Sequence, residues 1–139
     1  VMKKMLFIIA IFTIQLFPQG EILTKENADK LFGPVLVSKE IPTETLEMYT
    51  NQSANVIMFK LMNNDLYILD NNRNALLPLG VTINSTEVFS MYSVAIVQQL
   101  LSDGNNPFTY VEKRKDVLTI TNGEFTLEYS LSCPPICPN

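Results

Sequence analysis

Residues 117–132 read VLTITNGEFTLEYSLS, two runs of alternating apolar and polar residues on either side of Asn122-Gly123. Asn-Gly readily adopts the positive φ angles of a two-residue type I′ turn, so we expect a hairpin that turns at these two residues. Alternation then gives the second strand two different faces. The faces are Phe125, Leu127, Tyr129 and Leu131 on one side and Thr126, Glu128, Ser130 and Ser132 on the other. Leu118 and Ile120 can join the apolar face.

The segment PFTYVEKRKDVL upstream of the hairpin predicts another strand and a turn at residues 113–116. Lys113-Arg114-Lys115 is the only basic cluster, and we interpret it as a solvated hairpin tip. The result is a three-stranded meander whose apolar face must be covered. A helix over residues 86–102 is the natural cover. It has Ser85 or Thr86 as its cap, and its apolar residues recur at helical spacing.

The N-terminal half predicts further short elements. Thr24 can cap a helix, KENADKLF, that ends at Gly33, and PVLVSKEI then reads as a strand. NVIMFKLM, LYILD and ALLPLG are strand candidates separated by asparagine-rich turns, whereas residues 42–54 fit a short helix or an irregular link. We therefore expect an α+β fold, with an antiparallel meander sheet of about five to seven strands packed on one main helix.

Residues 1–19, VMKKMLFIIAIFTIQLFPQ, are typical of a secretory signal peptide. Lys3 and Lys4 precede an apolar run over residues 5–17, which is shorter than the roughly 20 residues of a spanning helix. Cleavage near Gln19 or Gly20 is expected, and an uncleaved membrane anchor is the alternative. The predicted organisation is a signal peptide at 1–19, one α+β domain at 22–132 and a Cys/Pro-rich tail at 133–139. We predict a secreted or periplasmic protein.

The composition excludes several chemistries. The chain has no histidine, which removes Ser-His-Asp and Cys-His nucleophile systems and histidine-based zinc sites. A net charge of −4 disfavours nucleic-acid binding. No phosphate-binding glycine loop and no paired carboxylates stand out, so we expect no cofactor and no catalysis. The oxygen-rich run from Asp70 to Asn74 lacks the glycine and glutamate of a calcium loop and predicts a polar turn.

Two asparagines match the acceptor pattern for N-glycosylation. These are Asn51 in Asn51-Gln52-Ser53 and Asn84 in Asn84-Ser85-Thr86. The pattern matters only in a source that glycosylates its exported proteins. A modified asparagine must be exposed.

Both cysteines lie in the tail, SCPPICPN, as Cys133 and Cys137. An extended proline-rich path would separate them by about 12 Å, whereas a disulfide needs Cα atoms roughly 4.4–6.8 Å apart. A disulfide therefore requires a turn at Pro134-Pro135-Ile136. A free or partner-bridged tail and a weak metal or redox site are the alternatives.

The pattern Cys133-Pro134-x-Ile136-Cys137-Pro138 resembles the copper-binding loop of the thioredoxin-like copper chaperones that assist cytochrome oxidase assembly. The resemblance covers about six residues. It implies that the two cysteines could bind copper together with a distant histidine. This chain has no histidine, so the third ligand does not carry over, and a dithiol able to bind Cu(I) or to be oxidised remains.

Our first hypothesis is a small binding or structural domain without catalysis, with an unknown protein or cell-surface partner and with membrane contact only through an uncleaved N-terminal segment. It predicts that no cleft is lined by converging titratable groups. The alternative is copper handling or disulfide exchange through Cys133 and Cys137. An enzyme that uses only carboxylates and tyrosines is a weaker third hypothesis.

Overall fold

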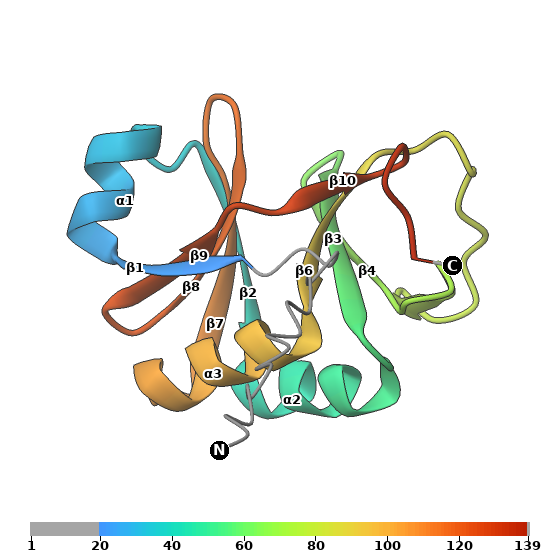
Figure 1. Ribbon diagram of the computed structural model, residues 1–139, viewed down its shortest axis with the longest axis horizontal. Coiled ribbons are helices and arrows are strands. Elements are labelled where there is room, and N and C mark those ends of the chain that lie inside the picture. Colours follow the sequence, from blue (N-terminus) through green and yellow to red (C-terminus); the bar gives the residue numbers. More distant parts are fainter. Residues whose placement is uncertain (1–19, 139) are drawn as a thin grey trace, which may run out of the picture.

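A computed structural model describes residues 20–138, and the predicted signal peptide at 1–19 lies outside the described residues. In the described part of the chain, ten strands form two five-stranded antiparallel sheets, and three helices pack on them (Figure 1). The α+β class and the antiparallel pairing are thus confirmed. The prediction of one sheet on one main helix is wrong, because the strands divide between two sheets.

Sheet A contains Glu21–Thr24 (β1), Val37–Pro42 (β2), Phe108–Lys113 (β7), Leu118–Asn122 (β8) and Phe125–Glu128 (β9). Its strand order is β1-β9-β8-β7-β2. The predicted C-terminal meander forms its centre, and the two N-terminal strands extend it at opposite edges. Each edge is therefore completed by a strand that lies far away in the sequence.

The β8–β9 hairpin turns one residue later than the sequence predicted. Asn122 pairs with Phe125, so Gly123 and Glu124 form the two-residue loop. Gly123 alone has a positive φ, 59°, as a type II′ turn requires at its first position. Asn122 is instead a buried strand residue, and its amide nitrogen donates to the Thr109 hydroxyl at 2.9 Å.

Sheet B contains Val56–Met62 (β3), Asp65–Leu69 (β4), Ala75–Leu77 (β5), Phe89–Ser93 (β6) and Leu131–Cys133 (β10), in the order β10-β6-β3-β4-β5. The chain crosses from sheet A to sheet B between β9 and β10, where Tyr129 has a φ of 62° (Figure 1). The alternation predicted to run on to Ser132 therefore ends at Glu128, because the last strand pairs with β6 in the other sheet.

The predicted helix over residues 86–102 is wrong in its first half. β6 occupies that half, and the helix α3 covers only Val94–Gly104. The hydroxyl of Ser93 accepts a hydrogen bond from the amide of Ile96 at 3.2 Å and so caps the helix. β6 lies between β3 and β10, and both of its faces are largely buried, so it lacks the apolar–polar alternation of a half-exposed strand.

Helix α1, Lys25–Phe32, begins and ends where the sequence predicted. The Thr24 hydroxyl accepts from the amide of Asn27 at 3.2 Å, and Gly33 has a φ of 80°. The ambiguous residues 42–54 form helix α2, Thr43–Gln52. The strand predicted over 34–41 begins only at Val37.

The main core lies between the inner faces of the two sheets, and α2 and α3 close its lower end (Figure 1). Helix α3 contacts β6, β8 and β9, so it does cover the apolar face of the meander. The fully buried core residues include Ile57, Phe59, Ile68, Tyr92, Val97, Leu100, Val111, Ile120 and Leu127. Burial of this apolar surface is the main term that stabilises the fold.

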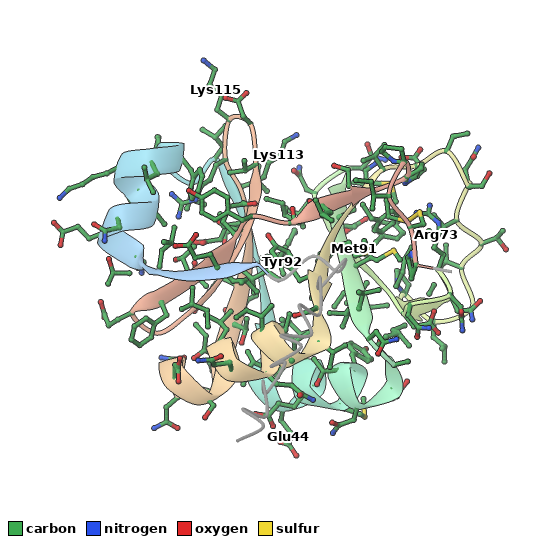
Figure 2. The ribbon with its side chains drawn as sticks, viewed as in Figure 1. Glu44, Arg73, Met91, Tyr92, Lys113 and Lys115 are labelled. Carbon is green, nitrogen blue, oxygen red and sulfur yellow. A yellow bond between two sulfur atoms is a disulfide. The ribbon has the colours of Figure 1, made fainter. Side chains whose placement is uncertain are left out.

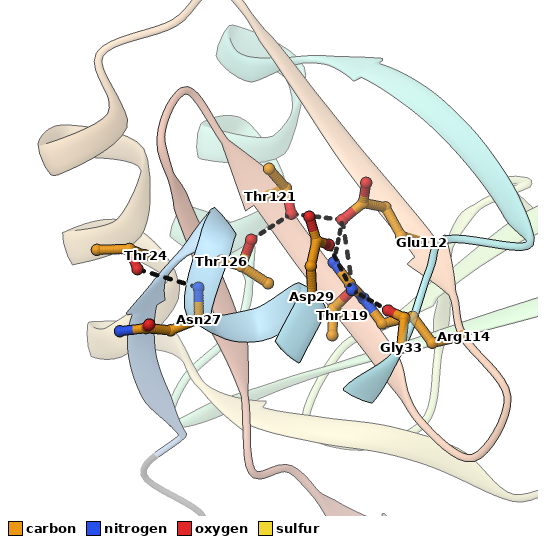
Figure 3. A network of polar contacts seen from close by, with 9 residues as sticks. All are labelled: Thr24, Asn27, Asp29, Gly33, Glu112, Arg114, Thr119, Thr121 and Thr126. Carbon is orange, nitrogen blue, oxygen red and sulfur yellow. Dashed lines mark hydrogen bonds and ion pairs between the residues drawn. The ribbon is translucent and has the colours of Figure 1, made fainter. Parts of the chain in front are cut away.

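The outer face of sheet A is polar and buried beneath α1 (Figure 3). Arg114 is 1% exposed; its Nη1 donates to Asp29 Oδ1 at 2.8 Å and to the Gly33 carbonyl, and its Nε donates to Thr119 at 3.1 Å. Glu112 accepts hydrogen bonds from the hydroxyls of Thr119 and Thr121. The interpretation of residues 113–115 as a solvated tip is therefore wrong for Arg114.

The outer face of sheet B is apolar. Its buried residues are Val56, Met58, Leu69, Phe89, Met91 and Cys133. Arg73 lies beside this cluster, with its guanidinium 5.3 Å from the centroid of the Phe89 ring (Figure 2). Arg73 donates hydrogen bonds to the carbonyls of Asn84 and Glu87 in the loop before β6 and to the carbonyl of Cys133 at the end of β10, which ties that loop to the edge of the sheet.

Candidate functional site

A groove of about 410 Å³ lies between the β7–β8 hairpin of sheet A and strands β3, β6 and β10 of sheet B. Sheet A contributes residues 113–118 and Glu128, and sheet B contributes residues 59–61, Val88, Ser90 and Ser132. Ser130, from the segment that crosses between the sheets, also lines it. The groove therefore forms where the two sheets diverge at the end opposite α2 and α3.

Three lysines line this groove. Lys60 forms an ion pair with Glu87, and its Nζ lies 5.8 Å from the centroid of the Phe89 ring. Lys113 and Lys115, at the hairpin tip, make no ion pair with any residue in the described range 20–138 (Figure 2). Asp116 is the exposed carboxylate of the same tip. The rim of the groove thus carries two free cations on a protein of net negative charge.

Glu128 is the buried acid of the groove, with only 4% of its surface exposed. Its Oε1 accepts from the amides of Tyr129 at 2.8 Å and Ser130 at 3.3 Å, while its Oε2 has no hydrogen-bond partner among the described residues. Burial raises the pKa of Glu128, against the opposing effects of those two amides, of Arg114 and of the Ser130 hydroxyl. A buried oxygen without a partner is costly, which marks it as a position that a ligand can satisfy.

Tyr92 lies beneath the groove at the end of the shared core (Figure 2). Its hydroxyl donates to the carbonyl of Leu118 at 2.8 Å. Burial, and next the charge of Glu128, raise the pKa of Tyr92 well above its ordinary value. Tyr92 therefore stays neutral at physiological pH and holds β6 against β8; it is not placed to act as a base.

The presence of this groove contradicts one expectation from the sequence. The non-catalytic hypothesis predicted no cleft lined by converging titratable groups, and the groove has Lys60, Lys113, Lys115 and Glu128 in its lining. The groups do not form an acid–base or nucleophile–base pair, however. Glu128 is the only buried carboxylate in the lining, and Tyr92 is already hydrogen-bonded to a backbone carbonyl.

Cys133 and Cys137 form a disulfide with their Cα atoms 4.8 Å apart, so the tail turns at the intervening prolines. The Cys133–Pro134 and Pro134–Pro135 peptide bonds are both cis. Cys133 is fully buried in the outer cluster of sheet B, whereas Cys137 is exposed. The disulfide, one of the three alternatives from the sequence, is thus the state found.

The two glycosylation sequons occupy different environments. Asn84 lies in an exposed turn before β6, where its Oδ1 accepts from the amide of Thr86 at 2.9 Å. Asn51 is exposed near the end of α2, but Ser53 of the same sequon is 7% exposed. Neither asparagine lines the groove.

The predicted polar turn after β4 is confirmed: Asp70 Oδ1 accepts from the amides of Asn72 and Asn74, each at 2.9 Å. Within residues 20–138, no group of three or more histidine, cysteine, aspartate or glutamate side chains is placed to hold a metal ion. No helix in that same range is long and apolar enough to cross a membrane.

Sequence reasoning missed most of the groove. Lys113 and Lys115 were noticed as a basic cluster, but Lys60, Glu128 and Ser130 were placed on ordinary strand faces. No local pattern identifies them, because the groove depends on how two sheets diverge. Tyr129, where the chain passes from one sheet to the other with a φ of 62°, is not a turn-forming residue, so the sequence gives no signal there either.

Comparisons of this chain with known protein families, with curated proteins and with solved structures found no match.

Proposed function

We propose that this protein is a secreted or periplasmic binding domain without catalytic activity, and that the groove between its two sheets is the ligand site. The observation that carries the proposal is the combination of a buried, unpartnered Glu128 Oε2 with the unpaired cations Lys113 and Lys115 in one groove. A volume of about 410 Å³ is within the range of small-ligand sites. A cell-surface or protein partner can present such a ligand as part of its own surface.

The chemistry of the groove favours binding over catalysis. The lining has neither the cysteine of a thiol nucleophile nor the histidine that most often activates a hydroxyl. Glu128 is the only buried carboxyl in the lining, and the lysines there are either exposed or, in the case of Lys60, paired with Glu87. A pair of proton-transfer groups is what acid–base mechanisms usually require.

Export is supported by the sequence of residues 1–19 and is compatible with the disulfide, since disulfides persist in oxidising compartments. The thiol-dependent alternative has less support. Cys133 is bonded and fully buried, so neither a free thiolate nor an accessible metal ligand is present at that position.

Amide chemical-shift mapping tests the proposed site. The exported protein, purified with its disulfide intact, is titrated with pools of small sugars, organic acids, phosphates, amines and amino acids. We expect at least one pool to shift the amides of Lys113, Ser90 and Ser130, which lie on three sides of the groove. Shifts confined to other surfaces, or none from any pool, would contradict the proposal.

Intact-mass measurement of the exported protein tests the compartment. The expected mass corresponds to cleavage near Gln19 or Gly20 and to two cysteines without their thiol hydrogens. Retention of residues 1–19 in a membrane fraction would contradict secretion and favour the anchor alternative.

A further inference from the structure

The groove presents its polar groups in two zones. The hairpin rim has the ammonium groups of Lys113 and Lys115, and the interior has the carboxyl of Glu128 with the hydroxyls of Ser90, Ser130 and Ser132 around the groove. An anion alone satisfies only the cations, which are Lys113 and Lys115 at the rim and Arg114 Nη2 in the wall, and a neutral polyol satisfies only the carboxyl and the hydroxyls. The two zones together require a ligand that carries both kinds of group.

We propose that the groove binds an acidic saccharide, a sugar unit whose anionic group lies at Lys113 and Lys115 and whose hydroxyls contact Glu128 and the three serines. This inference rests on the proposed function, because it names the ligand class of the same groove. The anionic group is a carboxylate, a phosphate or a sulfate, all of which pair with ammonium groups.

The rim supports the anionic part of the ligand. Lys60 is neutralised by Glu87, but Lys113 and Lys115 have no ion-pair partner in the described part of the chain. Asp116 at the same tip forms no ion pair with either lysine. Because these cations are exposed, their attraction for an anion should weaken as ionic strength rises.

The interior supports the hydroxyl part. Glu128 Oε2 is an acceptor when the carboxyl is ionised, and one carboxyl oxygen is a donor when it is protonated. A sugar hydroxyl both donates and accepts, so it pairs with either state. Acetate has no hydroxyl to donate to an ionised carboxylate, and the charge of that carboxylate repels both acetate and phosphate. Glu128 thus selects against inorganic anions that the lysines alone would accept.

The size and lining of the groove fit one or two sugar units in contact with protein. Leu61, Val88 and Val117 add apolar surface between the polar zones, and such surface packs against the C–H groups of a sugar ring. The hydroxyls of Ser90 and Ser132 belong to neighbouring paired strands, since Ser132 is directly opposite Ser90 in the register. They are therefore fixed by the sheet instead of by a loop.

Calorimetric and amide-shift titrations of the exported protein separate these contributions. The probes are glucuronate and glucose 6-phosphate, which combine both groups, and glucose, acetate and inorganic phosphate, which have one each. We expect both acidic sugars to shift the groove amides and to bind about tenfold or more tightly than any single-group probe, a difference of about 1.4 kcal/mol. Comparison of the two acidic sugars identifies the preferred anion.

Two variants test which residues bind the anionic part of the ligand and which bind its hydroxyls. Lys113→Gln with Lys115→Gln should weaken the acidic sugars about tenfold and remove most of the salt dependence, while Glu128→Gln should reduce the preference for acidic sugars over acetate and phosphate. Lys25→Gln with Lys30→Gln, on α1 away from the groove, is the matched charge control and should have no effect. Thermal unfolding of each variant shows that it is folded.

Two outcomes would overturn the inference and leave the groove-binding proposal in place. One is glucose binding in the groove as tightly as glucuronate, which would make the lysines irrelevant. The other is phosphate or acetate binding as tightly as the sugars, which would make the hydroxyl zone irrelevant. If no pool in the chemical-shift screen shifts the groove amides, the result would instead contradict the proposal that the groove is a binding site.

Discussion

The two sheets share one apolar core, yet their outer faces are built from opposite chemistries. Sheet A buries an arginine, a glutamate and several threonines beneath α1, while sheet B buries methionine, phenylalanine and one cysteine of the disulfide beneath loops. On each face one arginine donates to a backbone carbonyl: Arg114 donates to the carbonyl of Gly33 at the end of α1, and Arg73 donates to the carbonyl of Cys133 at the start of the tail. The comparison shows that a covering segment can be held either by directed polar contacts or by packing plus a covalent bond.

Arg114→Met, on the polar outer face of sheet A, should lower the free energy of unfolding more than any other variant described below. It leaves Glu112, which is 6% exposed, without its ion-pair partner, and we expect the free energy of unfolding to fall by about 3–5 kcal/mol in denaturant titration. The double variant Arg114→Met, Glu112→Gln removes the stranded charge and should recover part of the loss. Equal losses in the single and double variants would show that the charge pair is not what Arg114 provides.

Met91→Ala tests the apolar face in the same way. Met91 is 2% exposed in the outer cluster of sheet B, and the cavity left by its truncation should cost about 3 kcal/mol in denaturant titration. Met48 is 50% exposed on α2, and Met48→Ala is the matched control with an expected change of about 0.5 kcal/mol or less. The loss in Met91→Ala should be independent of salt, because no charge is involved.

Cys137→Ala measures the covalent contribution to that face. It removes the disulfide while Cys133 stays in the cluster as a small apolar side chain. The bonded residues are 4 apart in sequence, so the entropy of closing this short loop predicts a loss of about 2 kcal/mol. The wild-type protein in reductant should unfold like the variant in the same denaturant titration. No difference between oxidised protein and variant would mean that packing alone holds the tail.

Glu128→Gln should have the smallest effect on stability, and that effect should depend on pH. Burial raises the pKa of Glu128 in the folded state, so the folded protein binds a proton more tightly than the unfolded chain. The stabilisation is complete below the ordinary glutamate pKa and is lost as the pH rises through the raised one. The charged or titratable neighbours are Arg114 and Tyr92, and neither changes charge in this window.

The measurement for Glu128 is the free energy of unfolding as a function of pH for both proteins. We expect the wild type to lose stability relative to Glu128→Gln as the pH rises through this window. Parallel curves for the two proteins would contradict a raised pKa. An increase of wild-type stability relative to the variant with pH would give the opposite sign and would mean that the two backbone amides dominate over burial.

Local signals in the sequence predicted the elements that depend on local chemistry. Thr24 and Gly33 bound α1 as predicted, and the alternation around Gly123 identified the β8–β9 hairpin. The strand β6 was missed because both of its faces are largely buried, which removes the period-2 pattern on which such a prediction depends. The prediction that Arg114 is solvated was wrong because α1, which covers Arg114, lies more than 80 residues earlier in the chain. No pattern within residues 113–116 indicates that contact.

The groove was beyond sequence reasoning for a related reason. Its lining comes from β3, β6, the β7–β8 hairpin, β9 and β10, and only the division of the strands into two sheets brings these together. Glu128 was assigned correctly to the polar face of its strand. Its burial follows from its place at the end of β9, where the chain leaves sheet A.

Two strands, β1 and β6, depend on partner strands that are made late in synthesis. β1 pairs only with β9 in sheet A, so it has no strand partner until β9 has been made. β6 pairs with β10 along one edge, so the backbone hydrogen-bonding groups of that edge stay unpaired until β10 has been made. All strands of sheet A are therefore present once residue 128 has been made, and all strands of sheet B once residue 133 has been made. β1 must therefore stay without a strand partner from residue 24 to residue 125 of synthesis, whereas the outer edge of β6 stays open only from residue 93 to residue 131.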